Sequence, residues 1–220
     1  TNPTATDAMD SVTVPHADQH ADVNDAVEAL QAKVGVDGSA VTSSLDYKVA
    51  NQGLTLVKSQ TVGSGVSSVT VSDAFSSQYE HYRITYYCST ATTTRTMWFR
   101  FIDDGGAEIT TGYSSANQVF QAGTTTRVAT DGYNLSEWNL TAWYGYTDTA
   151  FTFDGSIYMP YENDHATMQA ISGGGTAANV CGGTIRGSMN AQDVYTGFKF
   201  GASAGTFTGG TIRVYGYNNG

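Results

Sequence analysis

The chain is poor in several residues on which common kinds of protein depend. Its 220 residues include two cysteines, three prolines, four histidines and 10 lysines and arginines together. Two cysteines are too few for a disulfide framework and form no metal-type spacing. The 20 acidic residues bring the net charge to −10, which repels phosphate backbones and anionic lipids. No run of 18 apolar residues is present. We therefore expect a soluble, folded protein with no nucleic-acid partner and no membrane insertion.

Glycine and aromatic residues are abundant, and they are concentrated in one part of the chain. Two of the 25 glycines precede residue 52, and of the 14 Tyr, 9 Phe and 3 Trp only Tyr47 does. Residues 1–52 carry seven Asp and one Glu against two Lys, which leaves −4 of the total charge to residues 53–220. We divide the chain into an extended arm (1–14), a helical oligomerisation segment (15–52) and a β domain (53–220).

Apolar residues after Pro15 recur with helical spacing. They lie four, three and four residues apart and form a narrow a/d-type seam: Val23, Val27, Leu30 and Val34. Pro15 suits the first helical turn, and Gly35 suits a C-cap. A helix of about 20 residues with so narrow a seam is marginal alone. We expect the seam to be an oligomer interface in a parallel bundle, with packing on the β domain as the alternative. The seam does not fix the number of helices, and Val at a with Leu at d favours a dimer if anything.

Two further features of the helical segment have open interpretations. His16 and His20 extend the seam backward, so copies in a bundle would face one another and form either an ion- or proton-binding layer or a frayed polar layer. A second, shorter helix is expected over residues 39–49. Its cap would be Ser39, Thr42 or Ser43, and three apolar side chains would point inward: Val41, Leu45 and Val49.

From Leu54 onward the apolar period is two, which is typical of strands. Tyr82, Ile84, Tyr86 and Cys88 alternate with polar residues, and Asp103–Asp104 followed by two glycines indicates a hairpin turn rather than a carboxylate pair. Further strand-like runs are expected at 66–72, 97–102, 116–121, 138–147, 149–159, 167–172, 195–200 and 211–217. The predicted fold class is mainly β, a sandwich or jelly-roll-like domain preceded by an α-helical coiled-coil segment.

No enzyme motif stands out in the sequence. It has no Gly-x-Ser-x-Gly, no P-loop, no β-helix repeat and no convincing carboxylate pair. His81 reads as a strand-end surface residue, residues 162–165 as a polar loop rather than a calcium site, and residues 172–176 as a flexible loop. We expect no enzymatic activity, no cofactor and no metal.

The densest aromatic patch gives the only candidate binding residues: Trp138, Trp143, Tyr144 and Tyr146. Exposed, they would form a stacking platform for a sugar or a protein; the alternative is that Trp138 and its alternating neighbours fill the core. Cys181 is expected in a loop, and a bridge between Cys88 and Cys181 is possible but not demanded.

The order of these parts resembles virion structural proteins of tailed bacteriophages, of the tail-fibre, spike and capsid-fibre types. The resemblance is carried by residues 16–35 and 37–49, by 75–84, by Phe99–Arg100–Phe101 and 112–114, and by the closing 209–216. It implies a homotrimer in the virion, made in the bacterial cytoplasm. The arm would dock on other virion proteins, and the β head would contact a host cell-surface glycan or protein. A capsid-attached decoration protein and a glycan-degrading spike are the alternatives.

Overall fold

The computed structural model describes residues 16–50, 53–91, 96–121, 127–140, 151–176 and 179–218. The chain divides into two compact units, one ending at Gln52 and the other running from Gly53 to Asn219. The division falls where the composition changes, since nearly all glycine and aromatic residues follow it.

The first unit contains the expected long helix, α1 (His16–Val34), which begins directly after Pro15. It ends as the sequence predicts. Gly35 has a left-handed φ of 87°, and its N–H donates to the carbonyl oxygen of Gln31 at 2.7 Å. A glycine takes up this conformation without a Cβ clash, so the last turn is closed by backbone hydrogen bonding.

The second helix, α2 (Leu45–Ala50), is shorter than expected and begins later. Its cap is Ser44, whose hydroxyl oxygen accepts from the N–H of Tyr47 at 3.2 Å. The proposed caps at residues 39, 42 and 43 are therefore wrong. The three apolar side chains expected to point inward are exposed within the first unit: Val41, Leu45 and Val49.

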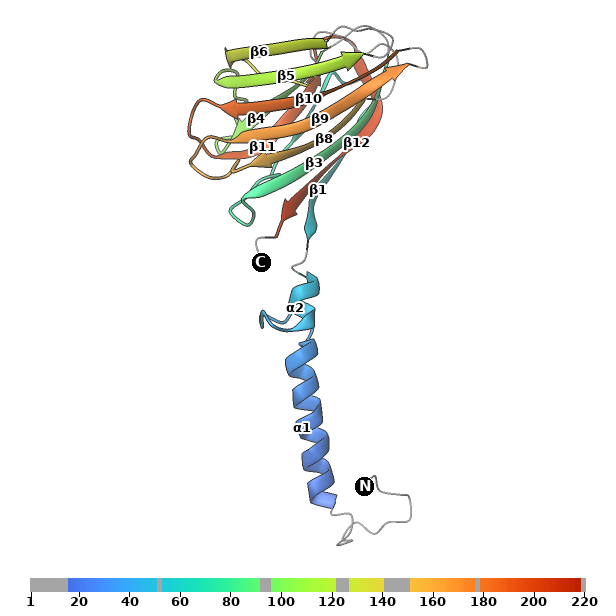
Figure 1. Cartoon of the computed structure of the whole chain (residues 1–220), viewed down its shortest axis with the longest axis vertical. Coiled ribbons are helices and arrows are strands. Elements are labelled where there is room, and N and C mark those ends of the chain that lie inside the picture. The colour runs from blue at the N-terminus through green and yellow to red at the C-terminus, as the bar shows by residue number, and fades with distance from the viewer. Residues whose placement is uncertain are drawn as a thin grey trace. The chain divides into compact units, whose positions relative to one another are not determined.

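The described part of the second unit contains twelve strands. They are β1 (Leu54–Val62), β2 (Ser68–Val71), β3 (His81–Ala91), β4 (Met97–Asp103), β5 (Tyr113–Gln121), β6 (Arg127–Leu135), β7 (Trp138–Asn139), β8 (Phe151–Tyr158), β9 (Thr167–Thr176), β10 (Asn179–Met189), β11 (Tyr195–Ala202) and β12 (Thr206–Tyr217). They form an eight-stranded sheet in the order β1-β12-β3-β8-β9-β10-β5-β6 and a four-stranded sheet in the order β2-β11-β4-β7 (Figure 1).

Eight of the strands pair as a jelly roll. Leaving aside β5, β6, β9 and β10, the first strand pairs with the last, β1 with β12, and the pairing then proceeds inward: β2 with β11, β3 with β8 and β4 with β7. This nested antiparallel pairing, split over two sheets, defines the double Greek key of a jelly roll. The predicted mainly β fold class is confirmed.

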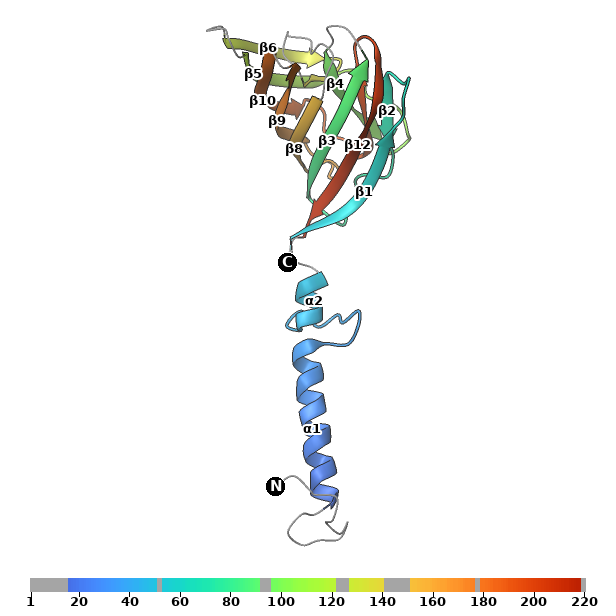
Figure 2. The same ribbon diagram turned by 90° about the vertical axis from the view of Figure 1, so that its right-hand side faces the viewer.

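The other four strands widen one sheet of the jelly roll. β9 and β10 follow β8, and the β5–β6 pair is added beyond them. The larger sheet twists strongly, so that β5 and β6 run across the direction of β1 and β12 (Figure 2). This extension gives the sheet a broad outer face that the eight jelly-roll strands alone would not provide.

Aromatic side chains fill the space between the sheets. Phe99 stacks on Phe198 with ring centroids 5.1 Å apart, and Phe101 stacks on Tyr195 at 4.2 Å. Among the described residues, the largest completely buried side chains are all aromatic: Trp138, Tyr82, Tyr86, Tyr113, Tyr195, Phe99, Phe101, Phe151, Phe198, Phe200 and Phe207. Burial of so much aromatic surface is the main source of stability in the domain.

Two stretches expected as loops are strands instead. Residues 172–176 belong to β9, and Cys181 belongs to β10, which pairs with β9 along its whole length. Glycines favour loops in a sequence, but here they let neighbouring strands approach closely. At Gly183, for example, a Cβ would collide with the backbone carbonyl oxygen of Gln118.

The register of the larger sheet argues against a bridge between Cys88 and Cys181. Cys88 on β3 pairs with Phe151, Phe151 with Gly174, and Gly174 with Cys181. Three strand spacings separate the two Cα atoms, roughly 14 Å, whereas a disulfide needs them within about 7 Å.

Candidate binding face of the larger sheet

The predicted seam residues all lie on the surface of α1. Val23, Val27, Leu30 and Val34 are 59%, 47%, 60% and 43% exposed. Helical side chains at these spacings share one face. Within the first unit this apolar face is therefore uncovered. His20 is exposed on the same helix, and the side chain of His16 lies outside the described residues.

Trp138 is not available as a surface binding residue. It is completely buried, because β7 turns its side chain into the sandwich, where it stacks on Phe99 at 5.6 Å. The surface role expected for it is wrong, and the alternative of a core residue, shared with Leu140, describes it correctly. The other three members of the patch, Trp143, Tyr144 and Tyr146, lie outside the described residues.

The remaining sequence candidates have local structural roles. Asp103 closes the predicted turn, since its carboxylate accepts from the N–H of Ala107 at 2.7 Å. His165 contacts the carbonyl oxygen of Met189 through Nδ1 at 2.8 Å, and the carboxylate of Asp164 accepts from the N–H of His165 at 2.6 Å. Within the described ranges no three His, Cys, Asp or Glu side chains gather as metal ligands.

His81, at the start of β3, is half-buried rather than fully on the surface. Its ring lies edge-on to that of Tyr158, with centroids 5.1 Å apart, and its Nδ1 atom is buried without a hydrogen-bond partner.

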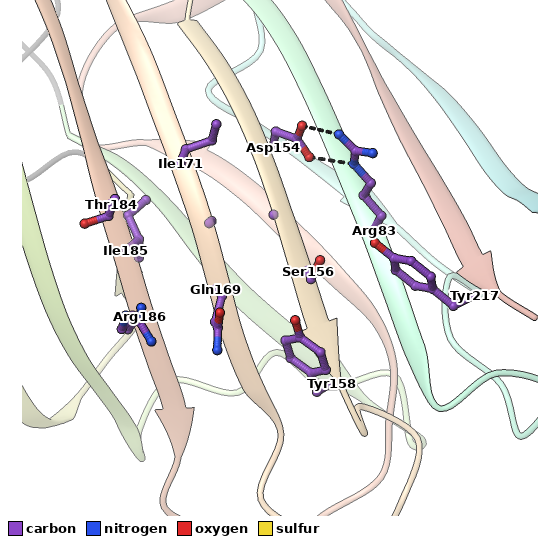
Figure 3. A pocket seen from close by; sticks show the side chains of 12 residues that line it. Arg83, Asp154, Ser156, Tyr158, Gln169, Ile171, Thr184, Ile185, Arg186 and Tyr217 are labelled. Atoms are coloured by element: carbon purple, nitrogen blue, oxygen red, sulfur yellow. Dashed lines mark hydrogen bonds and ion pairs between the residues drawn. The ribbon is translucent and has the colours of Figure 1, made fainter. Parts of the chain in front are cut away.

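Three shallow, open depressions on the outer face of the larger sheet are lined by described residues. The first, of about 390 Å³, crosses β12, β3, β8, β9 and β10 (Figure 3). Asp154 accepts two hydrogen bonds there from Arg83, at 2.8 and 2.5 Å. These bonds hold the pKa of Asp154 below its usual value, so both charges of the pair are already matched. Figure 3 shows Gln169 and Arg186 side by side on the next two strands.

The other two depressions lie farther along the sheet, over β10, β5 and β6. One, of about 530 Å³, is lined by Ser114, Ser115, Ala116, Asp131, Gly132, Tyr133, Arg186, Gly187 and Ser188. The other, of about 400 Å³, shares Ala116, Asp131 and Arg186 with it. Arg186 is the one residue that lines all three depressions. It therefore stands at the centre of the face.

Arg186 and Asp131 are both exposed and face the same depression. Register places them in one cross-strand row, on either side of Ala116. Unlike Arg83 and Asp154, neither forms an ion pair with a described residue. Tyr133, 79% exposed, lines the same depression. No local sequence motif identifies these residues. Arg186 is more than 50 positions away from Asp131 and Tyr133 in the chain, and only the strand order brings the three together.

The outer face of the smaller sheet is occupied by a closed ion-pair network. Arg100 binds Glu108 and Glu137, each at 2.6 Å, and Lys199 binds Glu108 at 2.7 Å. Partial burial alone would raise the pKa of Glu108, but hydrogen bonds from Lys199 and Arg100 outweigh it and the pKa is lowered. A carboxylate held ionised in this way is a poor proton donor at neutral pH.

Comparison with known proteins does not identify a family for this chain. No family model matches the chain, and no curated protein matches it significantly. Among solved structures, the chain is similar to the infectious bursal disease virus VP2 subviral particle at 10% identity and a TM-score of 0.13. The alignment covers 74% of this chain and 40% of that one, so the chain spans less than half its length. A likeness this weak carries no argument, and the jelly-roll assignment rests on strand pairing alone.

No helix in the described part of the chain is long and apolar enough to cross a membrane.

Proposed function

We propose that the protein is a non-enzymatic structural component of a tailed-bacteriophage virion. In this proposal it is a short homotrimeric fibre or spike, attached through residues 1–14 and presenting the β domain to the host surface. The apolar face of α1 carries the proposal. Four large side chains at a/d spacing are exposed on a 19-residue helix, which is marginal without a partner.

A second copy of the chain is the occupant that this spacing favours. Identical helices in parallel place Val23 against Val23 and Leu30 against Leu30, so every copy covers the seam of its neighbours. Burying the exposed part of each side chain contributes about 1 kcal/mol. The trimeric state itself is taken from the resemblance to phage fibres, since the seam alone is also compatible with a dimer.

The β domain suits a role in binding rather than in catalysis. Its outer depressions are open and lined by polar and charged side chains together with small apolar ones, and Glu108 on the smaller sheet is paired with Arg100 and Lys199. Shallow sites of this kind bind weakly one at a time. On a fibre with three copies, multivalent binding would give an avidity higher than the affinity of any single site.

Immunogold electron microscopy of the parent particle tests the proposal, with antibody raised against residues 53–220. Label at the tail is expected for a host-binding fibre. Label over the capsid would instead indicate a capsid fibre or decoration protein, and particle stability would then be the relevant assay. Intact particles without label would contradict a virion role altogether. A deletion of residues 1–14 should abolish incorporation while leaving the oligomer folded.

A further inference from the structure

The depression between β10, β5 and β6 combines three groups that differ in chemistry and converge on one space. Arg186 supplies a guanidinium, Asp131 a carboxylate and Tyr133 an aromatic ring. Its volume of about 530 Å³ lies within the range of small-ligand sites. Ser114 and Ser188 also line it.

The spacing of the two charges leaves room for a ligand between them. Arg186 and Asp131 are two strands apart in one row, so their backbones are roughly 10 Å apart. The side chain between them is the methyl group of Ala116, which is small and apolar. A guanidinium and a carboxylate thus flank a low apolar floor, and neither forms an ion pair with another described residue.

A sugar ring matches this set of groups better than an ion or an apolar ligand does. The hydroxyls of a pyranose both accept and donate hydrogen bonds, so a guanidinium and a carboxylate serve them at once. Its C–H faces are apolar and stack on an exposed aromatic ring such as Tyr133. The site holds one positive and one negative charge, which favours an uncharged ligand over an anion or a cation.

We propose that this depression binds a hexose unit of an uncharged polysaccharide. In this arrangement Arg186 donates to hydroxyls, Asp131 accepts from them and the ring of Tyr133 stacks on the C–H face. The inference deepens the proposed function, because it names the ligand class for the head that contacts the host surface. Its biological meaning rests on that function, but the binding itself is a property of the isolated chain.

The core supports this depression from beneath. A Cβ at Gly187 would lie 2.5 Å from Nε1 of Trp138, so the indole is pressed against β10 on the inner side of the sheet. The hydroxyl of Ser114 also donates to Oδ1 of Asn190 at 2.6 Å, which ties β5 to the end of β10. These contacts fix the strands that carry Arg186 and Ser114, and a prearranged site loses less entropy on binding.

Affinity electrophoresis of the full chain in gels containing dextran, mannan, galactan or chitin oligosaccharides tests the proposal. We expect retardation by at least one of them and none by polygalacturonate. Arg186→Gln and Tyr133→Ala should each weaken the retarding interaction about tenfold, the scale of one lost charge-assisted hydrogen bond or one lost ring contact. Asp131→Asn should weaken it less, since the amide still bonds hydroxyls.

Matched controls lie on the same outer face but outside all three depressions. Arg213→Gln removes an exposed arginine from β12, and Tyr87→Ala removes an exposed tyrosine from β3. Both should leave retardation unchanged. The proposal is overturned by no retardation in any neutral polysaccharide, by a preference for polygalacturonate, or by equal losses in the control variants. None of these results bears on where antibody labels the particle, so the virion role stands or falls separately.

Discussion

The indole N–H of Trp138, inside the sandwich, donates a hydrogen bond of 3.1 Å to the backbone carbonyl oxygen of Ser114. Ser114 lies on β5, where it lines the outer depression. One buried side chain therefore joins the packing of the core to the geometry of the candidate binding face. The aromatic patch seen in the sequence is connected with binding through this support rather than through exposure.

Replacing Trp138 by Phe should destabilise the domain by about 1–3 kcal/mol, since it removes this hydrogen bond and leaves a void. Urea unfolding followed by circular dichroism measures the change. Trp98→Phe is the matched control, because Trp98 is only half-buried, on the smaller sheet beside Arg100. It should cost less than about 1 kcal/mol. Equal losses would show that the burial of Trp138 is not what stabilises the domain.

Two adjacent glycines of β10 should respond differently to alanine. At Gly183 a Cβ would collide with the backbone of β5, whereas at Gly182 the nearest atom is the carbonyl oxygen of Ser172 at 3.3 Å. Gly183→Ala should therefore lower the free energy of unfolding by about 1–3 kcal/mol, and Gly182→Ala by less than about 1 kcal/mol. Thermal unfolding of the two variants measures both losses. A larger loss for Gly182→Ala than for Gly183→Ala would contradict the described register of β10 on β5.

Val27→Asp should dissociate the proposed oligomer, because it would bury an unpaired charge in the apolar seam. Ala29→Asp places the same charge on the same helix but off the seam, and should leave assembly intact. Light scattering coupled to size-exclusion chromatography gives the molar mass of each variant. A molar mass of Val27→Asp equal to that of the unmodified protein would contradict the proposed helical bundle.

The ion pairs of Glu108 predict a pH-dependent contribution to stability. Its folded pKa is lowered from the ordinary 4.5, so pairing stabilises the fold above that value and the contribution is lost as pH falls through the folded pKa. Glu108→Gln should cost about 1 kcal/mol at pH 7 and little near pH 2. Chemical denaturation at both pH values measures this. The control Glu162→Gln, at an exposed residue, should leave the free energy of unfolding unchanged at both pH values. If Glu108→Gln lowered this free energy equally at both pH values, the ion pairs of Glu108 would not be the source of the pH dependence.

Elements with a clear apolar period could be predicted from the sequence. The seam of Val23, Val27, Leu30 and Val34 located α1, and alternation around Ile84 and Phe99 located β3 and β4. Period and caps are local properties, so they are visible without knowledge of the fold. The mainly β class followed from the same alternation.

Strands rich in glycine escaped prediction because their stability comes from neighbours. β10 carries Gly182, Gly183 and Gly187, and it is held on one side by β9 and on the other by β5. β6 contains an Asp131–Gly132 step that favours a turn in isolation. The candidate site lies on these two strands and β5, which is why Arg186 and Tyr133 could not be found from sequence: their proximity is a matter of strand order.

The pairing of β1 with β12 has a consequence for biosynthesis. β12 lies between β1 and β3, bonded to both, so β1 cannot join the larger sheet until residue 217 has left the ribosome. Until then β1 and β3 present open edges, and contacts between residues so distant in sequence form slowly. Copies translated side by side could exchange their last strands at this stage. In the proposed oligomer, joining of the helical segments before the β domains close would raise the local concentration of these edges, so the timing of assembly would affect folding.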